Sequence, residues 1–133
     1  MINYEEYLKA TPSGVLATID GEGIKTRILQ YLFSDGNKAY FSTSSKKPVF
    51  AQLQSNPNAT FCTHPADFGL VLSISGKTVF VDDIALKTRA LEENPHKMKI
   101  YGAPDNPEFM LFYIDVKEVR TFSFKEGSKT YNV

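Results

Sequence analysis

The sequence predicts an α+β protein that is mainly β, with six or seven strands in a small closed barrel or sandwich and short helices between them. From residue 14 onward, apolar residues recur with period two in segments of strand length. The turn sequences DGEG and SDGN separate the first three segments. Because the chain has 133 residues, of which 42% are apolar, it is expected to form one domain, residues 1–133, around one core.

The first part of the chain reads as a helix followed by three strands. Residues 3–10 (NYEEYLKA) place apolar side chains at helical spacing, with Asn3 as the expected cap. Strands are expected over residues 14–19, 24–33 and 38–43. The second of these carries apolar residues on both faces, which predicts an interior strand.

The rest of the chain alternates helices with strands. Pro48 opens a helix that ends at Asn56 and Pro57. Gly76 interrupts a long strand, either as a tight hairpin or as a bend or bulge. Asp82 and Asp83 are positioned to cap the helix that follows. The expected helices are residues 48–55, 82–94 and 97–101, and the expected strands are residues 59–64, 70–82 and 109–124.

The composition and charge of the chain argue against several classes of function. Fifteen basic residues balance fifteen acidic ones, so the chain has no long-range positive field for nucleic acid or an anionic membrane. A single cysteine, Cys62, fits a reducing compartment. No secretory leader or membrane-spanning run is recognised. The protein is therefore expected to be cytoplasmic, with neither nucleic acid nor membrane as a partner.

A cluster of hydroxyl and basic residues precedes the helix that Pro48 opens. If the SDGN loop closes a four-residue hairpin, Phe33 lies opposite Lys38 and Arg27 lies opposite Ser44. Arg27, Lys46 and Lys47 would then converge at the N-terminus of this helix, where its dipole and free N–H groups favour a phosphate monoester. The alternative is that the lysines are ordinary solvated residues and that Arg27 pairs with a carboxylate.

The segments RILQYLF, KAYFSTSSKKPVFAQLQSNPNATF and LSISGKTVFVDD together resemble the FMN-binding split-barrel family related to pyridoxamine 5'-phosphate oxidase. The resemblance covers nearly the whole chain and implies a split β-barrel with short peripheral helices. It also implies an FMN cofactor and a homodimer with the flavin at the subunit interface.

The resemblance further implies a set of cofactor-binding residues. Arg27 and the backbone of Ile28 and Leu29 would run along the flavin. Thr43 and Ser45 would contact the ribityl phosphate, with Lys46 and Lys47 as its main charge partners. The same segment includes the remaining two residues of the expected cofactor-binding set, Ser42 and Ser44.

The chain departs from the true pyridoxamine phosphate oxidases where those enzymes bind their substrate. Leu32 stands where they carry a lysine for the substrate phosphate, and Val71 stands where they carry a flavin-contacting glutamine. The C-terminal substrate segment with its tryptophan is missing, since the chain has no tryptophan. Oxidation of vitamin B6 is therefore not expected.

Three possibilities remain after this comparison, of which a ligand-free structural dimer is the least favoured because of the cation cluster. The leading hypothesis is an FMN-dependent oxidoreductase that transfers hydride or electrons between NAD(P)H, or a similar donor, and a small acceptor. The alternative is a carrier or sensor that binds flavin or haem without turnover, in which His64 or His96 would be a haem ligand. No metal site is expected from the scattered Cys62, His64 and His96. The catalytic side chains are not identified.

Overall fold

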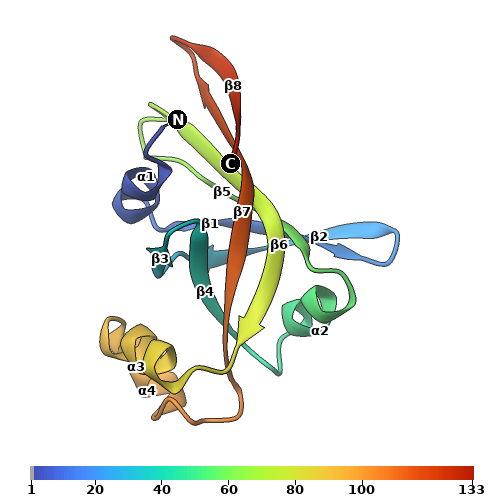
Figure 1. Ribbon diagram of the computed structural model, residues 1–133, viewed down its shortest axis with the longest axis vertical. Coiled ribbons are helices and arrows are strands. Elements are labelled where there is room, and N and C mark those ends of the chain that lie inside the picture. The colour runs from blue at the N-terminus through green and yellow to red at the C-terminus, as the bar shows by residue number, and fades with distance from the viewer. Residues whose placement is uncertain (1) are drawn as a thin grey trace.

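The computed structural model describes residues 2–133, which form one antiparallel sheet with helices at its periphery (Figure 1). The helices are α1 (Tyr4–Ala10), α2 (Pro48–Ser55), α3 (Ile84–Glu92) and α4 (Pro95–Tyr101). The strands are β1 (Ser13–Asp20), β2 (Gly23–Gln30), β3 (Phe33–Asp35), β4 (Lys38–Ser44), β5 (Asn58–Thr63), β6 (Val71–Val81), β7 (Phe109–Ser123) and β8 (Gly127–Asn132).

The sheet curls around a core without closing. Its strand order is β2-β1-β5-β6-β7-β4-β3, and β8 pairs with β7 outside this path. The α+β, mainly β architecture is as predicted, whereas the fully closed barrel is not. β2 and β3 are the two edges of the sheet, so β2 is not the interior strand that its apolar residues suggested.

The chain has more strands than predicted because the expected strand of residues 24–33 is broken. The Tyr31 N–H bonds to the carbonyl of Pro12, while the Leu32 N–H bonds to the carbonyl of Tyr40. The backbone therefore leaves β1 and joins β4 within two residues. The added strand β8 follows a tight turn after β7 and is mostly exposed.

The predicted register across the SDGN turn is wrong by two positions. Asp35 pairs with Lys38 and Phe33 with Tyr40, so only Gly36 and Asn37 form the loop. Gly36 supplies the positive φ of 58° that such a tight turn requires. Arg27 accordingly lies opposite Leu16 of β1 and not opposite Ser44.

Gly76 forms a β-bulge, which decides between the two predicted alternatives. The register of β6 against β7 shifts between Ser75 and Gly76, and the strand continues through the bulge. A Cβ at this position would overlap the carbonyl oxygen of Asp115, so only glycine permits this close approach.

The helices begin close to where the sequence predicts. α2 starts at Pro48, and the side chain of Asp83 caps α3 by accepting from the N–H groups of Ala85 and Leu86. Asn3 occupies the N-cap position of α1, but its side chain makes no capping bond within the described chain. Between residues 2 and 133, no helix is long and apolar enough to cross a membrane.

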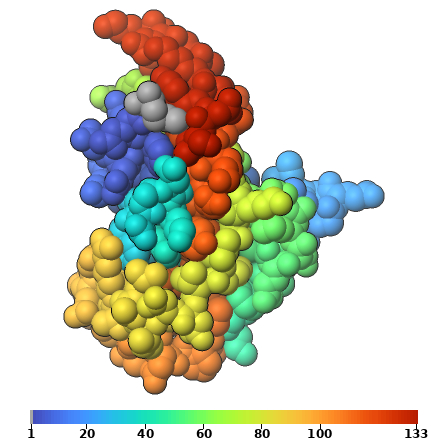
Figure 2. Space-filling view, in the orientation of Figure 1, coloured from blue at the N-terminus to red at the C-terminus, as the bar shows by residue number. Residues whose placement is uncertain are grey.

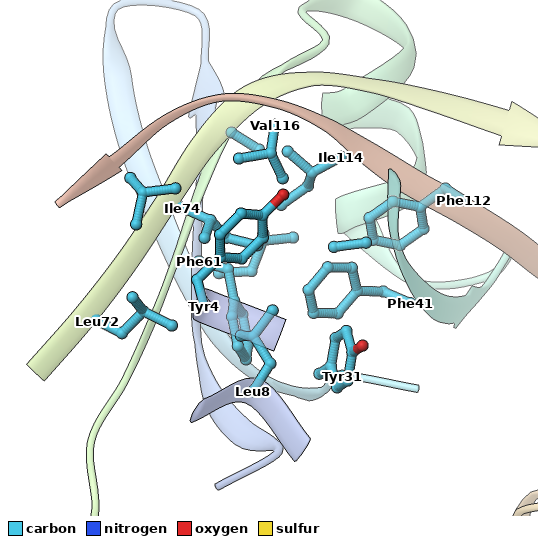
Figure 3. Packing of buried hydrophobic residues seen from close by; sticks show 14 of the residues in the cluster. Tyr4, Leu8, Tyr31, Phe41, Phe61, Leu72, Ile74, Phe112, Ile114 and Val116 are labelled. Carbon is cyan, nitrogen blue, oxygen red and sulfur yellow. The ribbon is translucent and has the colours of Figure 1, made fainter. Parts of the chain in front are cut away.

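Two hydrophobic clusters lie on opposite faces of β4. The larger one fills the curl of the sheet with Phe41, Phe61 and Phe112 and is covered by α1 (Figure 3). The smaller one contains Tyr40 and Phe109 and lies beneath α3 and α4. Since β4 is buried on both faces, its C-terminal end is a fixed platform for the turn that leads into α2.

Candidate anion-binding site

The turn between β4 and α2 is held by hydrogen bonds within the protein. The hydroxyl oxygen of Ser44 accepts from the Lys46 N–H at 3.1 Å, and the Ser44 carbonyl accepts from the Lys47 N–H at 3.0 Å. The Ser45 N–H donates to the carbonyl of Glu108 at the start of β7, also at 3.0 Å. These three N–H groups are therefore already bonded within the protein and are not free to bind an anion.

Among the described residues, the N-terminus of α2 nevertheless has neither a capping side chain nor an acidic residue in its first turn. Lys47 is the N-cap residue, Pro48 begins the helix, and the first turn contains no acidic residue. Within the described chain no side chain caps this helix, whereas Asp83 caps α3. Because the positive end of a helix favours negative charge, α2 presents an uncompensated site for an external anion.

Arg27 reaches toward α2 from β2 and is held there by neutral acceptors. One terminal nitrogen donates to the Thr18 hydroxyl at 2.8 Å and to the Leu16 carbonyl at 3.1 Å. The other donates to Oε1 of Gln52 in α2 at 2.6 Å, and the Thr18 hydroxyl donates to the same oxygen at 2.7 Å. Burial lowers the pKa of Arg27 below its usual value.

Asp20 lines the same cleft as Arg27 and Lys47 but forms no ion pair with either of them in the described chain. Among residues 2–133, the ion pairs include neither Arg27 nor Lys46 nor Lys47. In the described chain, Arg27 therefore does not pair with a carboxylate, as the alternative had predicted it would. Lys46 and Lys47 are exposed, as the same alternative predicted when it treated them as ordinary solvated residues.

A cleft of about 460 Å³ lies between β2 and α2 and brings Arg27 and Lys47 together. Its volume falls within the usual range for small-molecule pockets, roughly 300–1,000 Å³. Of the three cations predicted to converge, Arg27 and Lys47 share this cleft and Lys46 does not line it. They meet because α2 packs against β1 and Gln52 bonds to Arg27, and not through a β2–β4 ladder. The residues lining the cleft are Asp20, Lys25, Thr26, Arg27, Lys47, Pro48, Val49 and Gln52.

The other predicted site residues do not line this cleft. Ser42 and Thr43 are buried, and their hydroxyl oxygens have no hydrogen-bond partner within the described residues. Ser44 is buried and Ser45 is half-buried beside it. Ile28 is 68% exposed on the edge strand, with Leu29 half-buried beside it.

Sequence reasoning missed Gln52 and Lys25. Gln52 lies on the face of α2 that turns toward β1, and its carbonyl oxygen fixes both Arg27 and Thr18. The available signal was a glutamine one turn after Pro48 in a helix with an otherwise apolar inner side. Lys25 lies two residues before Arg27, so both side chains leave β2 on the same face.

Comparison with known proteins places this geometry in a family context. The family model described as pyridoxamine 5'-phosphate oxidase matches residues 2–123. A NimC/NimA family protein from Clostridium acetobutylicum superimposes with a TM-score of 0.84 at 26% identity, covering 97% of this chain and 90% of that one. No curated protein sequence gives a significant match.

Two further solved structures share the fold at lower identity. A pyridoxamine 5'-phosphate oxidase-related, FMN binding protein from Nostoc punctiforme has a TM-score of 0.68 and 16% identity, covering 98% of this chain and 90% of that one. A heme binding protein from Mycobacterium smegmatis has a TM-score of 0.75 and 17% identity, covering 93% of this chain and 54% of that one.

Proposed function

Because the chain belongs to the pyridoxamine 5'-phosphate oxidase family, as its sequence segments predicted, we propose that it is a flavoprotein that holds the phosphate of FMN in the cleft between β2 and α2. The observation that carries this proposal is the meeting of Arg27 and Lys47, both without a counter-ion in the described chain, at a helix start that no side chain caps. A phosphate dianion would compensate all three features together.

Each residue at the cleft would have a different role in binding the phosphate. Gln52 and Thr18 hold the guanidinium of Arg27 in place, so its remaining N–H donors can form a fork to two phosphate oxygens. Lys46 and Lys47 would add mobile point charges, with Ser45 as a further donor. Since β2 is an edge strand, one side of its backbone around Ile28 and Leu29 is free to lie along the flavin.

When bound, FMN would supply the redox chemistry by accepting and donating a hydride or single electrons, while the chain binds and orients it. We therefore favour an oxidoreductase that uses NAD(P)H or a similar small donor. The missing substrate-phosphate lysine at Leu32 argues for a substrate other than a vitamin B6 phosphate.

A second copy of the chain is the proposed partner, with the flavin between the two subunits. Val15, Ala17, Thr60 and Ser75 lie on the same outer face of adjacent strands, as their cross-strand pairing requires. Ile24 of β2 projects on this face and is 72% exposed. Burying this face against its copy would remove apolar surface from water and complete the cofactor site.

The test is a flavin titration of the purified protein. We expect a flavin absorption spectrum, or uptake of added FMN with quenching of its fluorescence, and a melting temperature that rises with FMN. Replacing both Lys46 and Lys47 by alanine should weaken FMN binding by about 100-fold or more, because two charge-assisted contacts worth roughly 1.5–3 kcal/mol each are lost. The matched control is K77A/K125A, which removes the same charge at two exposed lysines that form no ion pair in the described chain. Absence of any flavin binding would refute the proposal.

A haem carrier is the second candidate, because a structural neighbour is a heme binding protein. His64 and His96 could not serve the same haem. His64 lies near Ser123 at the end of β7, whereas α4, which carries His96, packs against Phe109 at its start. These ends are separated by on the order of 40 Å along the strand. A Soret band on haem addition that H64A or H96A abolishes would support this candidate over flavin.

A further inference from the structure

A second cavity lies at the end of the molecule away from α2. It has a volume of about 520 Å³, and the end of α1, the loop between β5 and β6 and the turn between β7 and β8 form its walls. In Figure 1 α1 and β8 lie toward the top of the view, and α2 lies well below them. Among the described residues, this cavity shares no lining residue with the cleft between β2 and α2. Its volume is within the usual range for small-molecule pockets, roughly 300–1,000 Å³.

The buried floor of this cavity carries two hydroxyl groups. Leu72, Thr63 and Ser123 line it and are all buried. The Thr63 hydroxyl donates within the protein, to the carbonyl of Thr11 at 2.7 Å. The Ser123 hydroxyl oxygen accepts from the Glu126 N–H at 3.0 Å, but among residues 2–133 its own O–H has no acceptor. Because a hydroxyl can accept and donate at once, this group is left to donate to an acceptor atom in the cavity.

His64 forms a flat wall of the cavity and is held in place by two contacts. Its Nδ1 lies 2.8 Å from the carbonyl of Pro65, which can only accept, so Nδ1 is the protonated nitrogen. One face of the ring stacks on Phe68, with centroids 4.2 Å apart and planes 13° apart. Phe68 adopts a φ of 56°, which is uncommon for a residue other than glycine, and it does not line the cavity itself. The imidazole is therefore ordered before any flat ligand packs against it, which favours binding.

The charged residues around the cavity include one cation without a partner. Glu126 pairs with Lys129 at 3.0 Å, and Oδ1 of the exposed Asp67 accepts from a backbone N–H at 2.8 Å. Lys125 is exposed and belongs to none of the ion pairs of residues 2–133. It lies two residues after Ser123, at the same turn. A hydroxyl donor and an unpaired ammonium thus border one side of the cavity, an arrangement that suits a carboxylate.

We propose that this cavity is a second ligand site, which binds a small carboxylic acid anion with a flat apolar body, such as an aromatic carboxylate. The ring packs between His64 and Leu72, and the carboxylate accepts from the Ser123 hydroxyl and pairs with the Lys125 ammonium. This inference goes beyond the proposed FMN function and does not rest on it, because the cleft that contains Arg27 is a different one.

The first experiment uses benzoate and benzamide, which share a ring and a carbonyl oxygen but differ in charge. An NMR titration of the backbone amides should localise both probes to residues 63–72 and 123–126. The wild type should bind benzoate about 10-fold more tightly than benzamide, as expected for one charged contact. K125M should bind the two probes alike, with the affinity that the wild type has for benzamide. The matched control K77M changes another exposed lysine without an ion pair in the described chain and should keep the wild-type preference.

Two further comparisons test the floor and the flat wall. S123A should weaken both probes by about 2- to 10-fold, because each presents a carbonyl oxygen to the hydroxyl. Cyclohexanecarboxylate has the charge of benzoate but not its flat ring, so the wild type should bind it less tightly than benzoate. Equal binding of these two carboxylates would contradict the role of His64 as a stacking wall.

Three results would overturn the inference: no benzoate-induced shifts in the two segments, equal binding of benzoate and benzamide by the wild type, or the same preference in K125M as in K77M. Tighter binding of benzylamine than of benzoate would also overturn it, because Asp67 and Glu126 would then set the charge of the ligand. K125M should bind FMN as the wild type does and should melt with it, since Lys125 is exposed and lies outside the FMN cleft. The outcome is therefore independent of whether the protein binds flavin.

Discussion

Replacing Arg27 by methionine tests whether this side chain serves the fold, the ligand or both. Its guanidinium joins β2 to α2 through Gln52 at 2.6 Å and to β1 through Thr18 at 2.8 Å. The same group is the only arginine lining the cleft within the described chain. Methionine keeps much of the aliphatic stem while removing every donor.

The expected loss of stability is modest. A hydrogen bond from a charged donor contributes roughly 1.5–3 kcal/mol, but the Thr18–Gln52 bond at 2.7 Å survives and the desolvation of the charge is relieved. The net cost should be about 1–2 kcal/mol, which for a chain of this size lowers the melting temperature by about 4–7 °C. Loss of a forked phosphate contact of about 2–3 kcal/mol should weaken FMN binding by roughly 30- to 150-fold.

Thermal unfolding without ligand and FMN fluorescence titration measure these two effects separately. T18V removes one of the groups that position Arg27 but leaves its charge and its bonds to Leu16 and Gln52, so it should cost about 1 kcal/mol and weaken FMN binding less than R27M does. R27K keeps the charge without the fork and should lie between wild type and R27M in affinity. If R27M loses stability but binds FMN as tightly as T18V, the phosphate role of Arg27 is refuted.

Three other predictions concern the fold. G76A should lower the free energy of unfolding by about 3 kcal/mol or more, because a Cβ would overlap the Asp115 carbonyl. In the control G23A the added Cβ makes only ordinary contact, so the free energy should change by less than about 0.5 kcal/mol. Urea unfolding measures both. D83A removes both capping bonds of α3 and should cost about 1 kcal/mol, or about 3–4 °C in melting temperature. Stability should fall as the pH rises past about 10, because burial raises the pKa of several tyrosines in the folded state and the unfolded chain then loses its protons first. The residues concerned are Tyr4, Tyr31, Tyr40 and Tyr101. Melting curves across this pH range check the last prediction, and a melting temperature that rises above pH 10 would contradict it.

Local chemistry made much of the fold predictable. Pro48 and Asp83 mark the starts of α2 and α3 because ring geometry and a capping carboxylate act within one turn. The break at Tyr31 was not predictable in this way, since it depends on a bond to the Pro12 carbonyl in a distant part of the chain. β8 was missed because its sequence is polar and mostly exposed, and backbone pairing with β7 alone makes it a strand.

For the candidate site, the sequence indicated some of the residues but not the way in which the fold brings them together. Arg27 and Lys47 do share a cleft, but the register used to bring them together was wrong. Gln52 brings Arg27 and Lys47 together because it bonds α2 to Thr18 of β1 and to Arg27 of β2. This is a tertiary contact, which the periodicity of the sequence does not encode.

The placement of charge gives the strongest argument that this end of the molecule evolved to meet an anion. The chain carries fifteen basic and fifteen acidic residues, so a carboxylate for every cation was available. The ion pairs found among residues 2–133 are all local, joining partners two to five positions apart. None extends to the basic residues around α2. Arg27 and Lys47 therefore share a cleft while neither has an ion-pair partner among the described residues. A bound phosphate would pair with both cations, so these charges would contribute to the affinity for an anion.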